Sequence, residues 1–347
     1  MPMHPPAPLP QALSNPRIHP ADPSIRFEVL PRDLSAYRVG NTGVPYAFRF
    51  DSGKPGPHVA INALTHGNEF CGMTAVCALL DAGVRPERGV LSLSFANVAA
   101  YQSFNIDSPF DARMLVHNLN RIWSAVQLNG TERSPDLDRA REMRPVFDRV
   151  DSLLDIHSTS QAVEPFFVAG ESTVNRALAN GIGFPPLQMW MPGGMSTGTP
   201  LIEYAQFGQA DSTHSGALVV ECGQHFAHAS GVMATQVALS FLAHHGTLSR
   251  TQAGALCEAF TGHNPLEQPF TAPRAYKMLS VHVIRTPELR WTRPLVGMEV
   301  FAKGELIGTD GELEIRSPCD NCTIFMPLGI NRVAVPGREG IYLTQPV

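Results

Sequence analysis

Long apolar runs, excess charge and glycine-rich loops are all missing from this sequence. No stretch reaches the roughly 18 consecutive apolar residues of a transmembrane helix, so no membrane span is predicted. The net charge is -5 and the isoelectric point is about 6.2, so neither nucleic acid nor an anionic membrane is an expected partner. The absence of a glycine-rich phosphate loop and of internal repeats argues against P-loop and solenoid proteins.

The first 23 residues lack an apolar segment and contain eight prolines. A secretory signal needs a basic start followed by an apolar stretch, so this segment is not expected to be one. Its composition cannot supply a packed core, and residues 1–24 are predicted to form a disordered or surface-draped arm. The expected location of the protein is the cytoplasm.

Cysteines are few, and only Cys319 and Cys322 form a CxxC pair. A zinc ribbon needs a second pair, and a redox CxxC opens a helix, whereas Pro318 precedes this pair and β-like sequence follows it. We therefore expect all six cysteines to be reduced thiols, as in a cytoplasmic protein.

The hydrophobic content of 44% over 347 residues is enough for a large core, in two domains or in one large domain with an appendage. Buried strands are predicted at residues 58–64, 90–97, 153–157, 165–169 and 217–222. Helices are predicted at residues 68–82, 135–150 and 230–244, and Pro145 should break or kink the second of these. This alternation indicates an α/β fold with a mixed, mostly parallel sheet flanked by helices.

After residue 262 the pattern changes to short strands separated by turns rich in Gly, Pro, Asp and Asn. Such a pattern is typical of a small β domain. The expected organisation is an arm at residues 1–24, an α/β domain at 25–261 and a C-terminal β domain at 262–347.

His66 and Glu69 lie three residues apart, where the first strong strand is expected to end and its helix to begin. Ligands bind at this edge of open α/β sheets. An imidazole nitrogen and a carboxylate oxygen aimed at one point suit zinc. Alone, however, such a pair is more typical of a surface or capping arrangement.

His157 ends another predicted buried strand, and Asp155 precedes it by two residues and so lies on the same strand face. This pair has two interpretations. His157 is either a metal ligand oriented by the Asp155 carboxylate, or a core histidine satisfied by hydrogen bonds.

Glu221 follows two valines on a third predicted strand. Burying a carboxylate there costs free energy unless the group has a partner or a function. Burial also raises its pKa, which suits proton transfer near neutral pH, and the alternative is a buried ion pair with an arginine.

Arg113 lies shortly before the dipeptide Asn120–Arg121. Arginine binds carboxylates through a bidentate fork, and a neighbouring amide adds donors, so the dipeptide is a candidate carboxylate clamp. Arg113 would supply a second positive group, although solvated surface arginines would give the same pattern.

Four motifs occur in a specific order: HGNE at residues 66–69, Arg113 through Arg121, DIH at 155–157 and VVECG at 219–223. This order resembles the succinylglutamate desuccinylase/aspartoacylase family, which has the zinc carboxypeptidase fold. Residues 318–343 also look like the C-terminal β domain of this family. The resemblance covers the chain from roughly residue 57 onward.

The resemblance implies that residues 25–261 are a zinc hydrolase catalytic domain with one Zn²⁺ per chain. Its metal ligands would be His66, Glu69 and His157. The implied reaction is hydrolysis of the amide bond of a small N-acyl amino acid or related amide, which is a C–N bond other than a peptide bond.

The remaining site residues also receive roles from the resemblance. Glu221 matches the general base that then acts as an acid, and Arg113 matches the arginine that stabilises the oxyanion. Asn120 and Arg121 match the pair that binds a substrate carboxylate.

One feature departs from the family. Aspartoacylases have an arginine shortly before the catalytic glutamate, but this chain has no Lys or Arg between Arg176 and Arg250. A second carboxylate clamp is missing there, so neither N-acetylaspartate nor N-succinylglutamate is the expected substrate.

Other functions stay open at this point. They are a metallocarboxypeptidase acting on peptides, ester hydrolysis by the same residues, and a non-catalytic zinc-binding module. The expected partner is a small-molecule substrate, and the pattern leaves homo-oligomerisation open.

Overall fold

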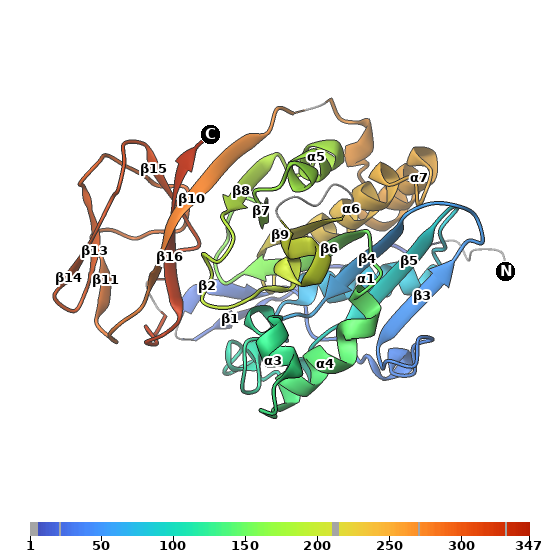
Figure 1. Cartoon of the computed structure of the whole chain (residues 1–347), viewed down its shortest axis with the longest axis horizontal. Helices are drawn as coiled ribbons and strands as arrows, with labels where there is room; N and C mark the ends of the chain where they lie inside the picture. The colour runs from blue at the N-terminus through green and yellow to red at the C-terminus, as the bar shows by residue number, and fades with distance from the viewer. Residues whose placement is uncertain (1–5, 21, 210–214, 270, 330–331) are drawn as a thin grey trace.

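The computed structural model describes residues 6–20, 22–209, 215–269, 271–329 and 332–347. In these residues an eleven-stranded sheet runs through the molecule in the order β12-β15-β16-β10-β8-β7-β9-β6-β4-β5-β3 (Figure 1). Seven of its strands are β3 (Ala47–Asp51), which forms one edge, β4 (His58–Ala63), β5 (Val90–Phe95), β6 (Ser152–Thr159), β7 (Phe166–Gly170), β8 (Leu187–Met191) and β9 (Gly216–Gln224). The pairs β4–β5, β4–β6, β6–β9 and β7–β8 are parallel, whereas β3–β5 and β7–β9 are antiparallel, which confirms the predicted mixed sheet.

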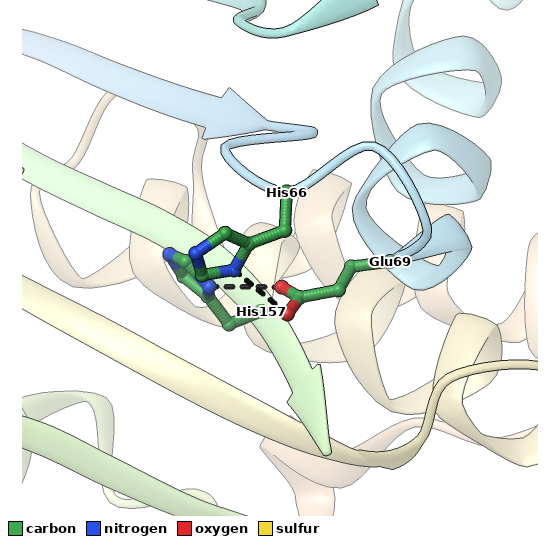
Figure 2. Close-up of side chains that lie close together, drawn as sticks. All are labelled: His66, Glu69 and His157. Carbon is green, nitrogen blue, oxygen red and sulfur yellow. Dashed lines mark hydrogen bonds and ion pairs between the residues drawn. The ribbon is translucent and has the colours of Figure 1, made fainter. Parts of the chain in front are cut away.

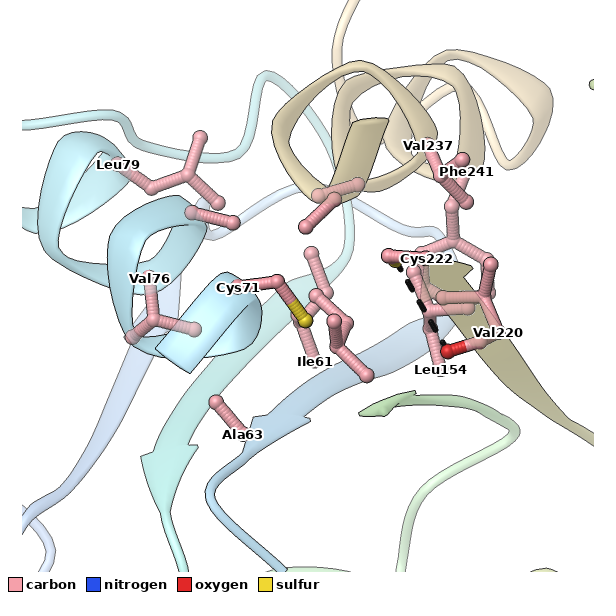
Figure 3. Close-up of a cluster of buried hydrophobic side chains, with 14 of the residues drawn as sticks. Ile61, Ala63, Cys71, Val76, Leu79, Leu154, Val220, Cys222, Val237 and Phe241 are labelled. Carbon is pink, nitrogen blue, oxygen red and sulfur yellow. Dashed lines mark hydrogen bonds between the residues drawn. The ribbon is translucent and has the colours of Figure 1, made fainter. Parts of the chain in front are cut away.

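The two faces of the sheet bury separate cores because side chains alternate along each strand. One face is covered by α1 (Phe70–Asp81), α5 (Thr173–Ile182), α6 (His228–His244) and α7 (Arg250–Thr261), and the other by α3 (Ala125–Asn129) and α4 (Pro135–Phe147). Figure 3 shows the first core, in which Ile61 and Val220 of the sheet lie near Leu79 of α1 and Phe241 of α6. His157 of β6 and Glu221 of β9, two of the site residues described below, project from the other face of the sheet.

The sequence pattern located most of these elements but not all. The structure contains the predicted helices as α1, α4 and α6, and α4 is not broken at Pro145, which lies two residues before its last residue. A proline there removes only one hydrogen bond near the helix end. The elements β8, α5 and α7 were not predicted.

Shorter helical segments are α2 (Val98–Gln102), η1 (Ser35–Tyr37), η2 (Asp111–Arg113), η3 (Leu119–Arg121), η4 (Leu201–Glu203), η5 (Ala205–Gly208) and η6 (Pro265–Glu267).

The described part of the proline-rich arm packs against the rest of the chain. Leu9 is buried, and its backbone N–H donates to the carbonyl of Phe260 at 2.9 Å. The hairpin of β1 (Arg17–His19) and β2 (Asp22–Phe27) follows, and the Phe27 ring lies 4.7 Å from that of Phe226. Residues 1–5 and 21 lie outside the described residues.

The C-terminal segment extends the same sheet. It consists of β10 (Arg274–Val283), β11 (Leu289–Trp291), β12 (Val300–Phe301), β13 (Leu306–Asp310), β14 (Leu313–Arg316), β15 (Cys322–Phe325) and β16 (Glu339–Pro346). Strand β10 is parallel to β8 and antiparallel to β16, and β11, β13 and β14 form a separate small sheet. The hydrogen-bonded sheet therefore continues across residue 262, and a domain boundary there stays a prediction.

Among the described helices, none is both long and apolar enough to cross a membrane.

Candidate functional site

The site begins where β4 ends and α1 starts. Leu64 has a φ of 58°, a left-handed conformation that non-glycine residues rarely adopt, and it turns the chain out of the strand. The next residues bring the side chains of His66 and Glu69 together, both buried. Glu69 immediately precedes α1, where the positive end of the helix dipole stabilises a carboxylate.

Gly67 allows this turn to pack closely. A Cβ at this position would lie 2.3 Å from the backbone nitrogen of Tyr101 and 2.5 Å from the carbonyl oxygen of Ala112. Gly67→Ala is therefore expected to lower the free energy of unfolding by about 1–3 kcal/mol and to displace the flanking site residues. Denaturant unfolding measures the loss, with Gly193→Ala as the control because nothing lies within 4 Å of a Cβ there. Equal stability of both variants would contradict the packing argument.

His157 reaches the same point from β6. Its Nδ1 lies 2.8 Å from Oε2 of Glu69, and Nδ1 of His66 lies 2.8 Å from Oε1 of that carboxylate (Figure 2). One ligand atom from each of the three residues lies within 4.8 Å of the others. Among the described residues this is the single group of three or more such side chains that could hold a metal ion.

The outer nitrogens of both imidazoles are fixed by oxygen acceptors. Nε2 of His66 lies 2.9 Å from Oδ1 of Asn118, and Nε2 of His157 lies 2.9 Å from Oδ2 of Asp155. Asp155 in turn accepts a 2.8 Å hydrogen bond from Nδ2 of Asn62. With the Nε2 atoms donating, the Nδ1 lone pairs are the ones left to face a cation. The orienting position predicted for Asp155 is the one that the structure shows.

Electrostatics give His66 and Glu69 the ionisation states that a divalent cation needs, whereas His157 holds a proton in this structure. Burial lowers the pKa of His66 to about 4, and the charge of Arg113 adds to this effect. Burial alone would raise the pKa of Glu69, but the two adjacent histidines hold it well below its usual range. Burial alone would lower the pKa of His157, yet the carboxylates of Asp155 and Glu69 raise it well above the usual value. The ligand atoms of the three buried side chains thus surround one point. The proton on His157 balances the negative charge of Asp155 and Glu69, and a metal cation at this point would balance it equally well.

Glu221 lies next to this group on β9. Strands β6 and β9 are parallel, and Glu221 is the register partner of His157, so both side chains project from the same face. The side chain is 8% exposed, and its Oε2 has no hydrogen-bond partner among the described residues. Burial, with the charge of Glu69 adding, raises its pKa to about 8, although His157 and Arg113 oppose the rise. No described arginine forms an ion pair with Glu221.

A cavity of about 490 Å³ opens onto these groups. All seven site residues predicted from the sequence line it: His66, Glu69, Arg113, Asn120, Arg121, His157 and Glu221. The C-terminal segment contributes further lining residues that the sequence did not indicate, among them Arg332, Arg338, Glu339 and Tyr342. His225, whose ring nitrogen lies 2.8 Å from the hydroxyl of Ser158, also lines the cavity.

The arginines differ in their partners. Nη1 of Arg113 donates to Oε1 of Glu69 at 3.1 Å, and the Arg113 side chain is 33% exposed. Nε of Arg121 donates to Oε1 of Glu339 at 3.2 Å, and its Nη2 donates to Oε2 of the same carboxylate. Oδ1 of Asn120 accepts from the backbone N–H of Leu201 at 3.0 Å. Both residues of the predicted carboxylate clamp therefore have partners within the chain.

The Glu339 ion pair predicts a pH dependence of stability. Burial would raise the pKa of Glu339, but Arg121, Tyr342 and Thr197 lower it to about 2. Because the folded-state pKa is depressed, the stabilisation is present above the unfolded pKa of about 4.3 and is lost as the pH falls toward 2. We expect Glu339→Gln to cost on the order of 3 kcal/mol at pH 7 and about half of that or less at pH 3. Urea unfolding at the two pH values measures this, and a pH-independent difference would contradict it.

Part of the chain is similar to a known protein family. Residues 55–179 match the succinylglutamate desuccinylase/aspartoacylase catalytic domain. The comparison with curated proteins found no match. The solved structure of succinylglutamate desuccinylase from Vibrio parahaemolyticus has a TM-score of 0.61 at 16% identity, over 87% of this chain and 86% of that chain. A succinylglutamate desuccinylase/aspartoacylase from Rhodobacter sphaeroides has a TM-score of 0.58 at 18% identity, over 85% and 87%.

A third structure covers more of both chains. The product-bound ectoine utilization protein EutE (DoeB) from Ruegeria pomeroyi has a TM-score of 0.59 at 16% identity, over 95% of this chain and 98% of that chain. The matched family segment contains the HGNE and DIH motifs, whereas Glu221 and the C-terminal strands lie beyond it. Residues 55–179 are thus similar to the catalytic domain of the succinylglutamate desuccinylase/aspartoacylase family, and the chain shares the fold of solved structures that carry this name.

Proposed function

We propose that the chain is a zinc-dependent hydrolase that cleaves the amide bond of a small N-acyl amino acid or a related amide. The observation that carries the proposal is the buried group of His66, Glu69 and His157 directly beside Glu221, whose Oε2 has no hydrogen-bond partner among the described residues. The family relationship supports the same reaction class.

The donor set fits zinc. Two imidazole nitrogens and one carboxylate are a common set of protein ligands in catalytic zinc sites, where a fourth position stays open. The outer nitrogens are already oriented by Asn118 and Asp155, so His66 and His157 need no rearrangement to present Nδ1. A zinc ion held there would supply Lewis acidity, which lowers the pKa of water and polarises a carbonyl.

Glu221 would move the proton. A buried carboxylate with one oxygen, Oε2, that has no partner in the described part of the chain can accept a proton from the attacking water. The same group can then donate that proton to the departing amine. Its raised pKa suits both steps, since a carboxyl with an ordinary pKa would hold the proton too weakly to return it.

Arg113 would stabilise the negative charge that develops on the carbonyl oxygen. Its guanidinium already reaches the metal-binding group through Glu69, and it lines the cavity. A preorganised cation at this position is of the kind that stabilises an oxyanion.

The shape of the cavity favours a small substrate over a peptide. Residues from the C-terminal segment, including Arg332 and Tyr342, line the same cavity as the zinc-binding group. A carboxypeptidase needs an open groove for the rest of its substrate, whereas a cavity of about 490 Å³ has the volume of a small-molecule site. The carboxylate-clamp role of Asn120 and Arg121, the cytoplasmic location and the oligomeric state stay predictions.

Metal analysis combined with a substrate panel tests the proposal. Purified protein is expected to contain about one zinc ion per chain and to hydrolyse at least one member of a panel of N-acyl amino acids. Treatment with a chelator should abolish turnover, and added zinc should restore it. Protein that binds no zinc and shows no turnover after zinc addition would refute the proposal, and cleavage of peptides in preference to N-acyl amino acids would favour the carboxypeptidase.

A further inference from the structure

A buried carboxylate outside the cavity holds the loop of residues 113–118, which carries part of the site. Asp136 lies in the first turn of α4, is fully buried and does not line the cavity. Three consecutive backbone N–H groups donate to it: that of Leu115 to Oδ1 at 3.3 Å, and those of Val116 and His117 to Oδ2 at 2.7 and 2.9 Å. A buried carboxylate needs such donors, because it has lost its hydration. Asp136 therefore fixes the backbone of these three residues.

The loop is tied to the metal-binding group at both of its ends. Oδ1 of Asn118 lies 2.9 Å from Nε2 of His66. The same oxygen accepts from the backbone N–H of Asn120 at 2.9 Å, which fixes the orientation of the carboxamide. At the other end, the carbonyl of Arg113 accepts from the backbone N–H of Gly67 at 3.2 Å. The position of the loop and that of the His66 imidazole are thus linked.

A second contact joins the same carboxylate to the turn that precedes α1. Nδ2 of Asn97 donates to Oδ1 of Asp136 at 2.7 Å, and the backbone N–H of Asn97 donates to the carbonyl of Leu64 at 2.8 Å. Leu64 is the residue with the left-handed φ at which this turn begins. Asp136 is therefore bonded directly to the loop and, through Asn97, to the turn that carries His66.

We propose that Asp136 is a positioning residue for the metal-binding group: by fixing the loop, it holds the Asn118 side chain against Nε2 of His66 and keeps Nδ1 directed toward Glu69. The inference rests on the proposed zinc site and concerns a residue that touches neither the ion nor the substrate. Groups that orient a metal ligand through its second nitrogen typically contribute about 10–100-fold to metal affinity. Asp136 acts one step further away, so a contribution at the lower end of this range is expected.

The first test measures the zinc affinity of Asp136→Asn with a chromophoric chelator as competitor. The amide has the shape of the carboxylate, but its NH₂ group opposes the backbone N–H donors. The loop should therefore shift, and zinc binding should weaken by about 10-fold. Zinc affinity equal to that of the wild type in a folded Asp136→Asn protein would overturn the proposal.

Asp310→Asn is the matched control for a general loss of stability. Asp310 is also buried and also accepts from backbone N–H groups, those of Arg285 and Thr286, at 2.7 and 2.8 Å. It belongs to β13 in the separate small sheet and does not line the cavity. Both substitutions should lower stability in urea, but Asp310→Asn should leave the zinc affinity unchanged. Equal losses of zinc affinity in the two variants would overturn the positioning role.

A double-mutant cycle identifies the route of the effect. Asn118→Ala removes the acceptor on His66 directly and should weaken zinc binding by about 10–100-fold. Adding Asp136→Asn to this variant should cause little further loss, because residues that act through one another are not additive. Additive losses would overturn the route through Asn118.

Asn97→Ala decides the proposal if Asp136→Asn does not fold. It keeps the loop donors, removes the side-chain donor to Oδ1 and is expected to weaken zinc binding by about 3-fold. Because Asn97 also caps α2, Ser172→Ala, which removes the cap of α5, is its control. Unchanged zinc affinity in Asn97→Ala would overturn the role of Asp136 alone. A wild-type protein without zinc affinity would instead refute the zinc site and this inference with it.

Discussion

Replacing Glu221 by glutamine is expected to lower kcat by about 10³-fold while the zinc content stays unchanged. The amide has nearly the same shape as the carboxylate but can neither accept the proton of the attacking water nor return it to the amine. Glu221 lies beside the metal-binding group and outside it, so its loss should leave His66, Glu69 and His157 able to bind zinc.

Steady-state kinetics with the best N-acyl amino acid and metal analysis of the same preparation measure both effects. Glu312→Gln is the matched control, because Glu312 is exposed and does not line the cavity. A Glu221→Gln protein with kcat near the wild-type value would show that another group moves the proton. A variant that loses zinc as well would instead place Glu221 among the metal ligands.

The second large effect is expected from His157→Ala, which should abolish stoichiometric zinc binding and activity together. Removing a residue that merely orients a ligand typically costs about 10–100-fold in metal affinity, and loss of one of three direct ligands should cost more. The methyl side chain of alanine also leaves Asp155 and Glu69 without the imidazole that now lies between them.

Zinc titration with a competing chromophoric chelator quantifies this loss. His228→Ala is the control, because His228 opens α6 nearby but does not line the cavity. Full zinc occupancy in His157→Ala would contradict the assigned ligand set. A reduced zinc content in His228→Ala would point to a second metal-binding group.

The sequence predicted those elements whose apolar pattern is strong. Strands β4, β6 and β9 are short runs of aliphatic residues, and each continues into a polar residue that the fold places in the site. Strand β8 was missed because its sequence, LQMWM, contains no β-branched residue and is buried on both faces. The pairing of β8 with β10, which makes the sheet continuous, could not be predicted either, because parallel pairing between distant segments leaves no local sequence pattern.

The seven candidate residues chosen from the sequence line one cavity, and their roles there stay predictions. What the sequence could not provide is the pairing of charges. Arg121 and Glu339 are 218 residues apart, and only the folded chain shows that they neutralise each other. The strand register that places Glu221 beside His157 also depends on tertiary structure. The same holds for the hydrogen bond between Asn118 and His66.

The order of the site along the chain has a consequence for biosynthesis. His66, Glu69 and His157 belong to strands and turns that leave the ribosome well before β16, which carries Glu339. Protein segments can begin to fold as they are synthesised from the N-terminus. We therefore expect the three candidate metal ligands to come together early on the nascent chain, whereas the cavity wall that contains Glu339 and Tyr342 is completed only when the last strand pairs with β10 and β15.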